Sequence, residues 1–233
     1  MEDVDLLSEI ISELGDADVS DVRLCGHWAA VISKGCGVAH SFDTLGSVKD
    51  AGYLTEKGAL ELCEYAKSWN LKEASLGVAA INSLIEPRAE KGDGFDILSE
   101  NAKGKKVAIV GHFPRVVQIE EIAEEVWIFE KSPQEGDLPD TAVEYFIPKA
   151  DIVAITGSAV VNKSIERLLE LSNGFTIIIG PTTPMSPVLF DYGADLLAGC
   201  RVIDRERLMK KVSEGASCMK EIKSEIEFIV MEK

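Results

Sequence analysis

The stretch Val107–Glu121, VAIVGHFPRVVQIEE, opens with a short apolar run that ends in a glycine and continues in a helical pattern. A strand, a glycine turn and a helix form the first unit of nucleotide-binding α/β folds. Such folds place two more glycines in the turn, which let a pyrophosphate approach the backbone. Here the turn reads Gly111-His112-Phe113-Pro114, so the strand predicts the fold while the turn disfavours an ordinary NAD site.

Four more apolar runs follow, separated by helix-like or loop segments: VWIFE, DIVAITG, FTIIIG and ADLLAG. Continuous apolar runs of this length are typical of parallel strands that are covered on both faces. With right-handed crossovers, residues 91–233 are therefore predicted to form an α/β domain with a Rossmann-like parallel sheet of about five strands. The tail EFIVMEK fits either an edge strand or the end of a helix.

The first 90 residues show a different pattern. Apolar residues at helical spacing predict helices over 3–14 and 55–69 and through Val78–Ile85, and short extended runs between 21 and 42 predict an antiparallel meander. The segment EPRAEKGDGFD mixes proline, glycine and charge, as domain boundaries often do. We therefore expect a smaller α+β domain over 1–90 and the parallel domain over 91–233.

Composition limits the possible partners and compartments. A formal net charge of −16 repels phosphate backbones, which argues against nucleic acid. No apolar stretch approaches the ~20 residues that cross a bilayer, and the acidic start MEDVDLLSEI lacks the features of a signal peptide. Five scattered cysteines without a C-x-x-C pair indicate reduced thiols. We expect a cytoplasmic protein, with a homodimer as an open possibility.

Ligands of open parallel sheets bind outside the carboxyl ends of the strands, because the loops diverge there. Asn82 joins the residues at the predicted strand ends, because a polar side chain in an apolar helix needs a partner and can reach the cleft. The candidate binding residues are therefore Gly111, Phe113, Pro114, Thr156, Gly157, Ser158, Asn162, Gly180, Pro181, Thr182, Thr183 and Asn82. Their hydroxyl and amide groups suit a carboxylate or a ribose, although Ser158 can equally cap a helix.

His112 and Glu130 are the candidate catalytic and metal-binding residues. An imidazole at one strand end, beside an acid at the next, can ligate a metal or transfer a proton near neutral pH. The alternative is a hydrogen bond within the loop. Glu130 also follows Gly111 by about 20 residues, the spacing of a ribose-binding acid, so an adenosine-type ligand stays open.

A second group, around the predicted meander, comprises His27, Trp28, Cys36 and His40. Strand alternation does not put all four on one face, so core packing is favoured over a metal cluster. The GxSxG, HExxH, P-loop and EF-hand motifs are absent, which removes the commonest hydrolase, metalloprotease, nucleoside-triphosphatase and calcium-sensor functions.

Five segments together resemble the heavy-metal chelatase family along nearly the whole chain: GHWAAVISKGCGVAHSF, SLGVAAINSLIE, VAIVGHFPRV, DIVAITGSAVVNKSIERLL and IIIGPTTPMSPVLFDYGAD. The resemblance implies an enolase-N-terminal-like domain joined to a Rossmann-like domain, with the strand-end residues lining the cleft between them. It assigns no metal ligands.

Two functions remain open. The first is a metal-handling protein or metal chelatase of the lyase class, which takes Co, Ni, Fe or Zn, with a tetrapyrrole precursor as a partner and His112 accepting displaced protons. The second is a Rossmann-like enzyme or sensor for a nucleotide-like or small anionic ligand. A non-catalytic interaction module is the third reading.

Overall fold

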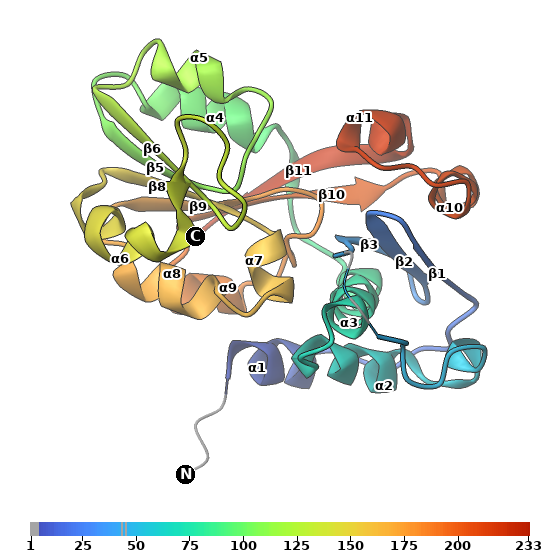
Figure 1. Cartoon of the computed structure of the whole chain (residues 1–233). Helices are drawn as coiled ribbons and strands as arrows, with labels where there is room; N and C mark the ends of the chain where they lie inside the picture. Colours follow the sequence, from blue (N-terminus) through green and yellow to red (C-terminus); the bar gives the residue numbers. More distant parts are fainter. Residues whose placement is uncertain (1–4, 43, 45) are drawn as a thin grey trace.

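The computed structural model describes residues 5–42, 44 and 46–233, which form a mixed α/β structure with two sheets. The small sheet is an antiparallel meander of β1 (Asp21–Cys25), β2 (Trp28–Ile32) and β3 (Cys36–His40). The large sheet has eight strands in the order β4-β11-β10-β9-β8-β5-β6-β7. Figure 1 shows the small sheet beside one end of the large one. The predicted fold class is confirmed.

All five predicted parallel strands form: β5 (Lys106–Val110), β6 (Glu125–Glu130), β8 (Ile152–Thr156), β9 (Phe175–Ile179) and β10 (Leu196–Val202). They are neighbours in the order β6-β5-β8-β9-β10. The chain starts in the middle at β5, steps outward to β6 and then returns to the other side of β5 with β8. Doubly wound sheets bind their ligands at such a reversal, because the connections leave in opposite directions there.

Three further strands widen the sheet beyond the predicted five. They are β7 (Leu138–Pro139), parallel to β6, then β11 (Ile226–Glu232), antiparallel to β10, and β4 (Glu90–Lys91), antiparallel to β11. The ambiguous tail is thus a strand. It pairs along the whole of β10, so its backbone donors and acceptors are satisfied by a neighbour that lies close in sequence.

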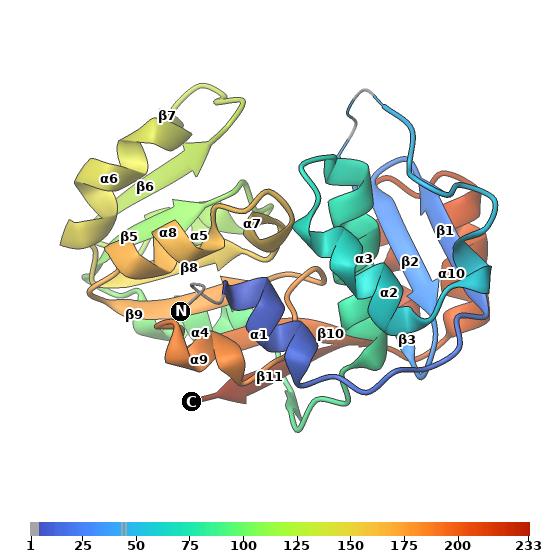
Figure 2. The same ribbon diagram turned by 90° about the horizontal axis from the view of Figure 1, so that it is seen from below.

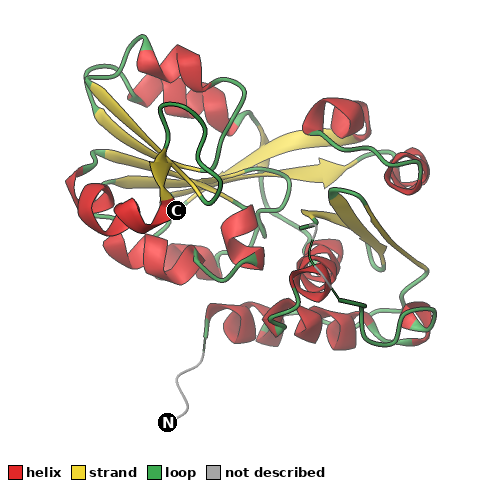
Figure 3. Cartoon of the chain, in the orientation of Figure 1, coloured by secondary structure: helices red, strands yellow, loops and turns green. Residues whose placement is uncertain are grey.

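Helices cover both faces of the large sheet, as Figure 3 shows. One face carries α4 (Gly94–Asn101) and α5 (Val116–Glu120), and the other carries α6 (Val143–Phe146), α8 (Ile165–Leu171) and α9 (Val188–Asp191). Short 3-10 helices flank α6 at Asp140–Ala142 and Ile147–Lys149. The five parallel strands therefore lie in a double-sided apolar core, which explains their unbroken hydrophobic runs.

Two helices, α7 (Ser158–Val161) and α8, follow β8 with a break between them. The break lies at Lys163, whose φ of 67° is in the left-handed region. The Lys163 ammonium donates to the carbonyl of Val161 at 2.9 Å and to the carbonyl of Ala66, which belongs to the first part of the chain. Burial lowers the pKa of Lys163 to about 8. This lysine therefore ties the two parts of the chain together at a desolvation cost.

The stability of the junction should depend on pH through Lys163. Its folded pKa lies below the ordinary value of 10.5, so the unfolded chain binds more protons between pH 8 and 10.5, and stability rises across that window. The unfolding free energy of wild type minus that of Lys163→Met should be about 2 kcal/mol larger at pH 10.5 than at pH 7.5. This figure is reduced for solvent screening, because the Lys163 side chain is partly exposed. Denaturant titrations of both proteins at the two pH values measure the difference. A constant difference would contradict the assignment.

The first part of the chain packs its helices under the small sheet. They are α1 (Leu6–Ser12), α2 (Ala59–Cys63) and α3 (Leu71–Leu84), with 3-10 turns at Leu54–Glu56 and Glu64–Lys67. Residues 3 and 4 of the predicted first helix lie outside the described residues. The predicted helix over 55–69 is broken into three pieces, and Trp69, expected on its apolar side, is 86% exposed. The likeness to the enolase N-terminal domain remains a prediction.

The connection between β10 and β11 crosses to the other face of the small sheet. It carries α10 (Arg205–Ser213), α11 (Met219–Ile222) and a 3-10 turn at Lys223–Glu225. Leu208, Met209 and Val212 of α10 pack with Trp28 and Val38 in one cluster.

The small sheet is therefore held between α3 and α10, as Figure 2 shows, and residues from the end of the chain share a core with its beginning. Glu225 fixes this connection: its carboxylate lies 2.6 Å from the Lys211 ammonium and 3.3 Å from the Arg207 guanidinium. The boundary at residue 90 remains a prediction about folding units.

No helix among the described residues combines the length and the apolar character that a bilayer crossing requires.

Candidate functional site

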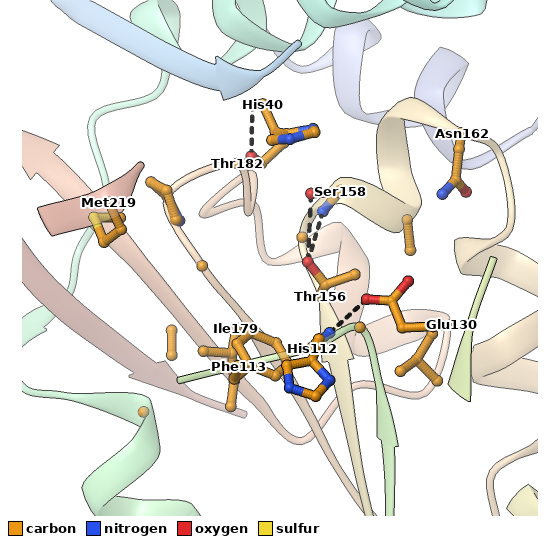
Figure 4. A pocket seen from close by; sticks show the side chains of 18 of the residues that line it. His40, His112, Phe113, Glu130, Thr156, Ser158, Asn162, Ile179, Thr182 and Met219 are labelled. Carbon is orange, nitrogen blue, oxygen red and sulfur yellow. Dashed lines mark hydrogen bonds between the residues drawn. The ribbon is translucent and has the colours of Figure 1, made fainter. Parts of the chain in front are cut away.

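A pocket of about 940 Å³ lies where the carboxyl ends of the parallel strands meet the small sheet. Its floor is formed by the loops that follow β5, β6, β8 and β9, including the reversal between β5 and β8. Its opposite wall comes from Trp28, His40 and Phe42, and part of its rim comes from the α11 segment with Met219. Figure 4 shows His40, Met219 and the strand-end residue Thr156 around one space. The structure thus brings both ends of the chain to the predicted strand tips.

Most of the predicted binding residues line this main pocket: Gly111, His112, Phe113, Pro114, Glu130, Thr156, Gly157, Ser158, Asn162, Gly180, Pro181 and Thr182. Asn82 and Thr183 lie instead in a second, smaller pocket of about 240 Å³. One hydrogen bond links the linings of the two pockets: the Asn82 side-chain amide donates to the Thr182 carbonyl at 3.3 Å.

The glycines at the strand tips have structural reasons that are independent of a phosphate. Gly111 and Gly180 have φ values of 100° and 123°, which L side chains rarely adopt. A Cβ on Gly157 would lie 2.6 Å from the backbone nitrogen of Thr183. These glycines let neighbouring strand ends pack closely and place no side chain on the pocket floor. Their presence is therefore explained without a bound dinucleotide.

His112 stands at the edge of the pocket on a loop that Glu130 holds. The backbone N–H of His112 donates to Oε1 of Glu130 at 2.7 Å, and the backbone N–H of Lys131 donates to Oε2 at 3.2 Å. The imidazole itself is 41% exposed, and its Nδ1 lies 3.5 Å from Oδ1 of Asp137. Asp137 was missed by sequence reasoning, because it follows the end of β6 by seven residues in an irregular loop.

The pocket does not offer a complete set of side-chain metal ligands. Within the described residues, no group of three histidine, cysteine, aspartate or glutamate side chains could hold a metal ion. Protein zinc sites, by comparison, use three or four such ligands. His112 lines the pocket, whereas its neighbour Asp137 does not, and Glu130 is already engaged with two backbone N–H groups.

The wall from the small sheet carries two ring nitrogens without partners. Nε1 of Trp28 and Nδ1 of His40 are buried and make no hydrogen bond, although both side chains line the main pocket. The His40 ring packs edge-on against Phe42, with centroids 4.8 Å apart, and its backbone N–H donates to Oγ1 of Thr182 at 2.9 Å. Burial, together with the nearby His27, lowers the pKa of His40. The sequence marked this segment, but its pattern suggested core packing.

The charge around the main pocket differs in sign from that of the whole chain. Its described lining includes more cations than carboxylates: Arg115, Lys131, Arg167, Lys220 and Lys223 against Asp93, Glu130 and Asp140. Arg115 bridges Asp93 at 3.1 Å and Asp96 at 2.6 Å. Among the residues that the structure describes, no carboxylate lies within ion-pair distance of Lys220 or Lys223. An anionic ligand is therefore favoured despite the net charge of −16.

Comparison with known proteins agrees with this architecture. The chain is similar over 98% of its length to 98% of a solved protein of unknown function from Desulfitobacterium hafniense, with a TM-score of 0.89 and 32% identity. A solved protein of unknown function from Pyrococcus horikoshii matches over 98% of this chain and 100% of its own, with a TM-score of 0.83; at 24% identity it shows the fold alone.

An uncharacterized protein of Methanocaldococcus jannaschii is 28% identical over 175 residues, which are 70% of this chain and 68% of that protein. A family model described as "Putative heavy-metal chelation", DUF4213, matches residues 7–85, and a second with the same description, DUF364, matches residues 93–231. Because the second model spans more than half of the sequence, and the Desulfitobacterium protein of the same family matches nearly all of it, the chain belongs to the DUF364 family.

Proposed function

We propose that the main pocket binds a planar, anionic organic ligand that receives or carries a heavy metal, with a tetrapyrrole precursor as the ligand class. The observation that carries the proposal is the pair of unpaired ring nitrogens, Nε1 of Trp28 and Nδ1 of His40, which are buried atoms of two side chains that line a 940 Å³ pocket. A buried polar group without a partner costs about 1–3 kcal/mol. A ligand that bonds to both nitrogens removes that cost when it binds.

Size and surface chemistry support a large, flat ligand. Small-molecule sites span about 300–1,000 Å³, so this pocket is at the large end of the range. Aromatic rings from both parts of the chain face it: Trp28, Phe42, Phe95, Phe113, Phe129 and Phe228. Aromatic faces stack on planar ligands, and the cations Lys220 and Lys223 at the rim suit its carboxylates.

The limited set of protein ligands defines how a metal would be held. The family description concerns heavy-metal chelation, whereas the described residues offer no group of three side-chain ligands for a metal ion. An organic chelator in the pocket would supply the remaining donors. In this proposal the metal, of the Co, Ni, Fe or Zn group, is cargo that meets the ligand in the pocket.

His112 is the proposed reactive side chain and Glu130 the residue that positions it. When a metal replaces the protons of ring nitrogens, a base must accept them, and an imidazole at the pocket edge suits that step. Glu130 accepts the His112 backbone N–H and so fixes the loop on which the ring stands. The reaction class would be that of a metal chelatase.

A nucleotide-like ligand is the second candidate. The reversal of strand order between β5 and β8 lies at the pocket floor, where doubly wound proteins bind nucleotides. Against an ordinary NAD site, the Phe113 ring occupies the first turn and packs on Phe95 with centroids 5.2 Å apart.

Substituting His40 tests the proposed ligand site. His40→Phe keeps an aromatic ring against Phe42 and removes the unpaired Nδ1. We expect unfolding free energy to stay within about 1 kcal/mol of wild type, while affinity for uroporphyrin, a polycarboxylate tetrapyrrole, falls about tenfold. Thermal shift and equilibrium titration measure both quantities.

His27→Phe is the matched control, because His27 is exposed and does not line the pocket. Wild-type protein that is stabilised by ADP and not by uroporphyrin would replace the first candidate with the second. Equal uroporphyrin affinities for wild type and His40→Phe would remove the ring nitrogen from the site. A ligand at 100 times its dissociation constant stabilises by about 2.7 kcal/mol, which a thermal shift resolves.

A further inference from the structure

A buried carboxylate approaches His112 from outside the lining of the main pocket. The Asp137 side chain is 2% exposed and does not line the pocket, whereas the His112 ring lines it and is 41% exposed. Oδ1 of Asp137 lies 3.5 Å from Nδ1 of His112. The imidazole therefore has an acidic neighbour at one ring nitrogen while another part of the ring is open to the pocket.

Backbone pairing fixes the place of this carboxylate. Asp137 directly precedes β7, which pairs with the end of β6. Its Oδ2 accepts the backbone N–H of Gln134 at 2.9 Å, and its own N–H donates to the Gln134 carbonyl at 3.1 Å. Glu130, the last residue of β6, accepts the backbone N–H of His112 at 2.7 Å. The carboxylate and the ring are thus both positioned from the end of β6.

The two groups have complementary hydrogen-bonding needs. Within the described part of the chain, Oδ1 of Asp137 has no neighbour of opposite polarity except His112, and Nε2 of His112 makes no hydrogen bond. A buried carboxylate oxygen favours a donor, and the hydrogen bond at one imidazole nitrogen decides which nitrogen carries the proton. Catalytic contacts of this kind are often long before a ligand binds, which fits the separation of 3.5 Å.

We propose that Asp137 is a positioning residue for His112: its carboxylate keeps the proton of the neutral ring on Nδ1 and leaves Nε2 unprotonated for the ligand in the main pocket. The role in metal insertion rests on the function proposed above. A divalent ion that enters the ligand displaces two protons from ring nitrogens. Nε2 accepts these protons one at a time and passes each to water, which reaches the exposed ring. Between the two transfers, the carboxylate of Asp137 stabilises the imidazolium.

Nitrogen-15 NMR of histidine-labelled protein reads the tautomer directly, because the chain has only three histidines. At about pH 9 imidazoles are neutral, and protonated and unprotonated ring nitrogens have well-separated chemical shifts. His112→Ala assigns the His112 signals by their loss. We expect mainly the Nδ1–H tautomer in wild type. This measurement needs neither ligand nor metal, so its outcome does not depend on the proposed function.

Asp137→Asn should reverse the tautomer, because Gln134 orients the new amide. The Gln134 N–H requires an acceptor, so the amide oxygen takes the place of Oδ2 and the amide NH₂ group faces Nδ1 of His112. That group donates to Nδ1, and the ring proton moves to Nε2. We expect the Nε2–H tautomer, a rate of Co²⁺ insertion into uroporphyrin about 100-fold lower, and uroporphyrin affinity within about twofold of wild type.

Glu135→Gln is the matched control, because it removes an exposed carboxylate from the same loop. It should change neither the tautomer nor the rate. A wild-type His112 that is mainly Nε2–H overturns the proposal, even if Asp137→Asn does not fold. A tautomer that Asp137→Asn leaves unchanged, or a wild-type insertion rate in that variant, overturns it too. Wild type that inserts no metal contradicts the proposed function, and the tautomer then still decides whether Asp137 positions His112.

Discussion

Replacing Gly37 with alanine is expected to destabilise the protein by about 3 kcal/mol or more, among the largest effects of a single methyl group in this chain. Gly37 lies in β3, directly against α3. A Cβ there would lie 2.0 Å from the carbonyl oxygen of Ala79 and 2.4 Å from the backbone nitrogen of Ser83. Both atoms belong to helix backbone, so β3 must move away from α3. Denaturant unfolding of purified protein measures the loss.

Gly15→Ala is the matched control, because nothing lies within 4 Å of a Cβ at that position. It should change unfolding free energy by less than about 0.5 kcal/mol. The displacement of β3 also matters for function, since His40 ends the same strand and forms part of the pocket wall. A Gly37→Ala protein as stable as wild type would mean that β3 and α3 are farther apart than described.

Removing the imidazole of His112 is expected to reduce protein-stimulated insertion of Co²⁺ into uroporphyrin about 100-fold. General-base catalysis typically contributes 10²–10⁴-fold, and His112 is the histidine at the strand tips of the pocket floor. Uroporphyrin affinity should stay within about twofold, because the ring stands at the pocket edge and is 41% exposed. The change in the visible spectrum of the porphyrin follows the rate.

His27→Ala is the control for general effects of removing a histidine, because His27 is exposed and outside the pocket lining. It should leave the rate unchanged. Glu130→Ala, which frees the His112 loop, should give an intermediate rate that retains the wild-type affinity for uroporphyrin. Equal insertion rates for wild type and His112→Ala would remove His112 from the reaction and leave the binding proposal standing.

Local sequence patterns predicted five strands of the large sheet and the edge of the sheet at which the main pocket lies. The sequence runs that form β5, β6, β8, β9 and β10 are apolar because helices cover both faces of the sheet. Each strand could therefore be recognised from its own residues alone. Their glycine ends then located Gly111, Gly157 and Gly180 at one edge of the sheet.

The opposite wall of the main pocket could not be predicted, because it depends on contacts between distant parts of the chain. Trp28 packs with Met209, 181 residues away, and this contact exists only because the β10–β11 connection crosses the small sheet. Asn82 was placed in the main cleft by its residue type and Thr183 by its position after a predicted strand, yet both line the second pocket. No pattern within a short window encodes either arrangement.

A crystal structure of the protein with bound uroporphyrin tests the central claim most directly. We predict density for the ring between the small sheet and the tips of β5 and β8, with hydrogen bonds from the ligand to Nε1 of Trp28 and Nδ1 of His40. Density at another surface, or a ring in the pocket that leaves both nitrogens unpaired, would contradict the account.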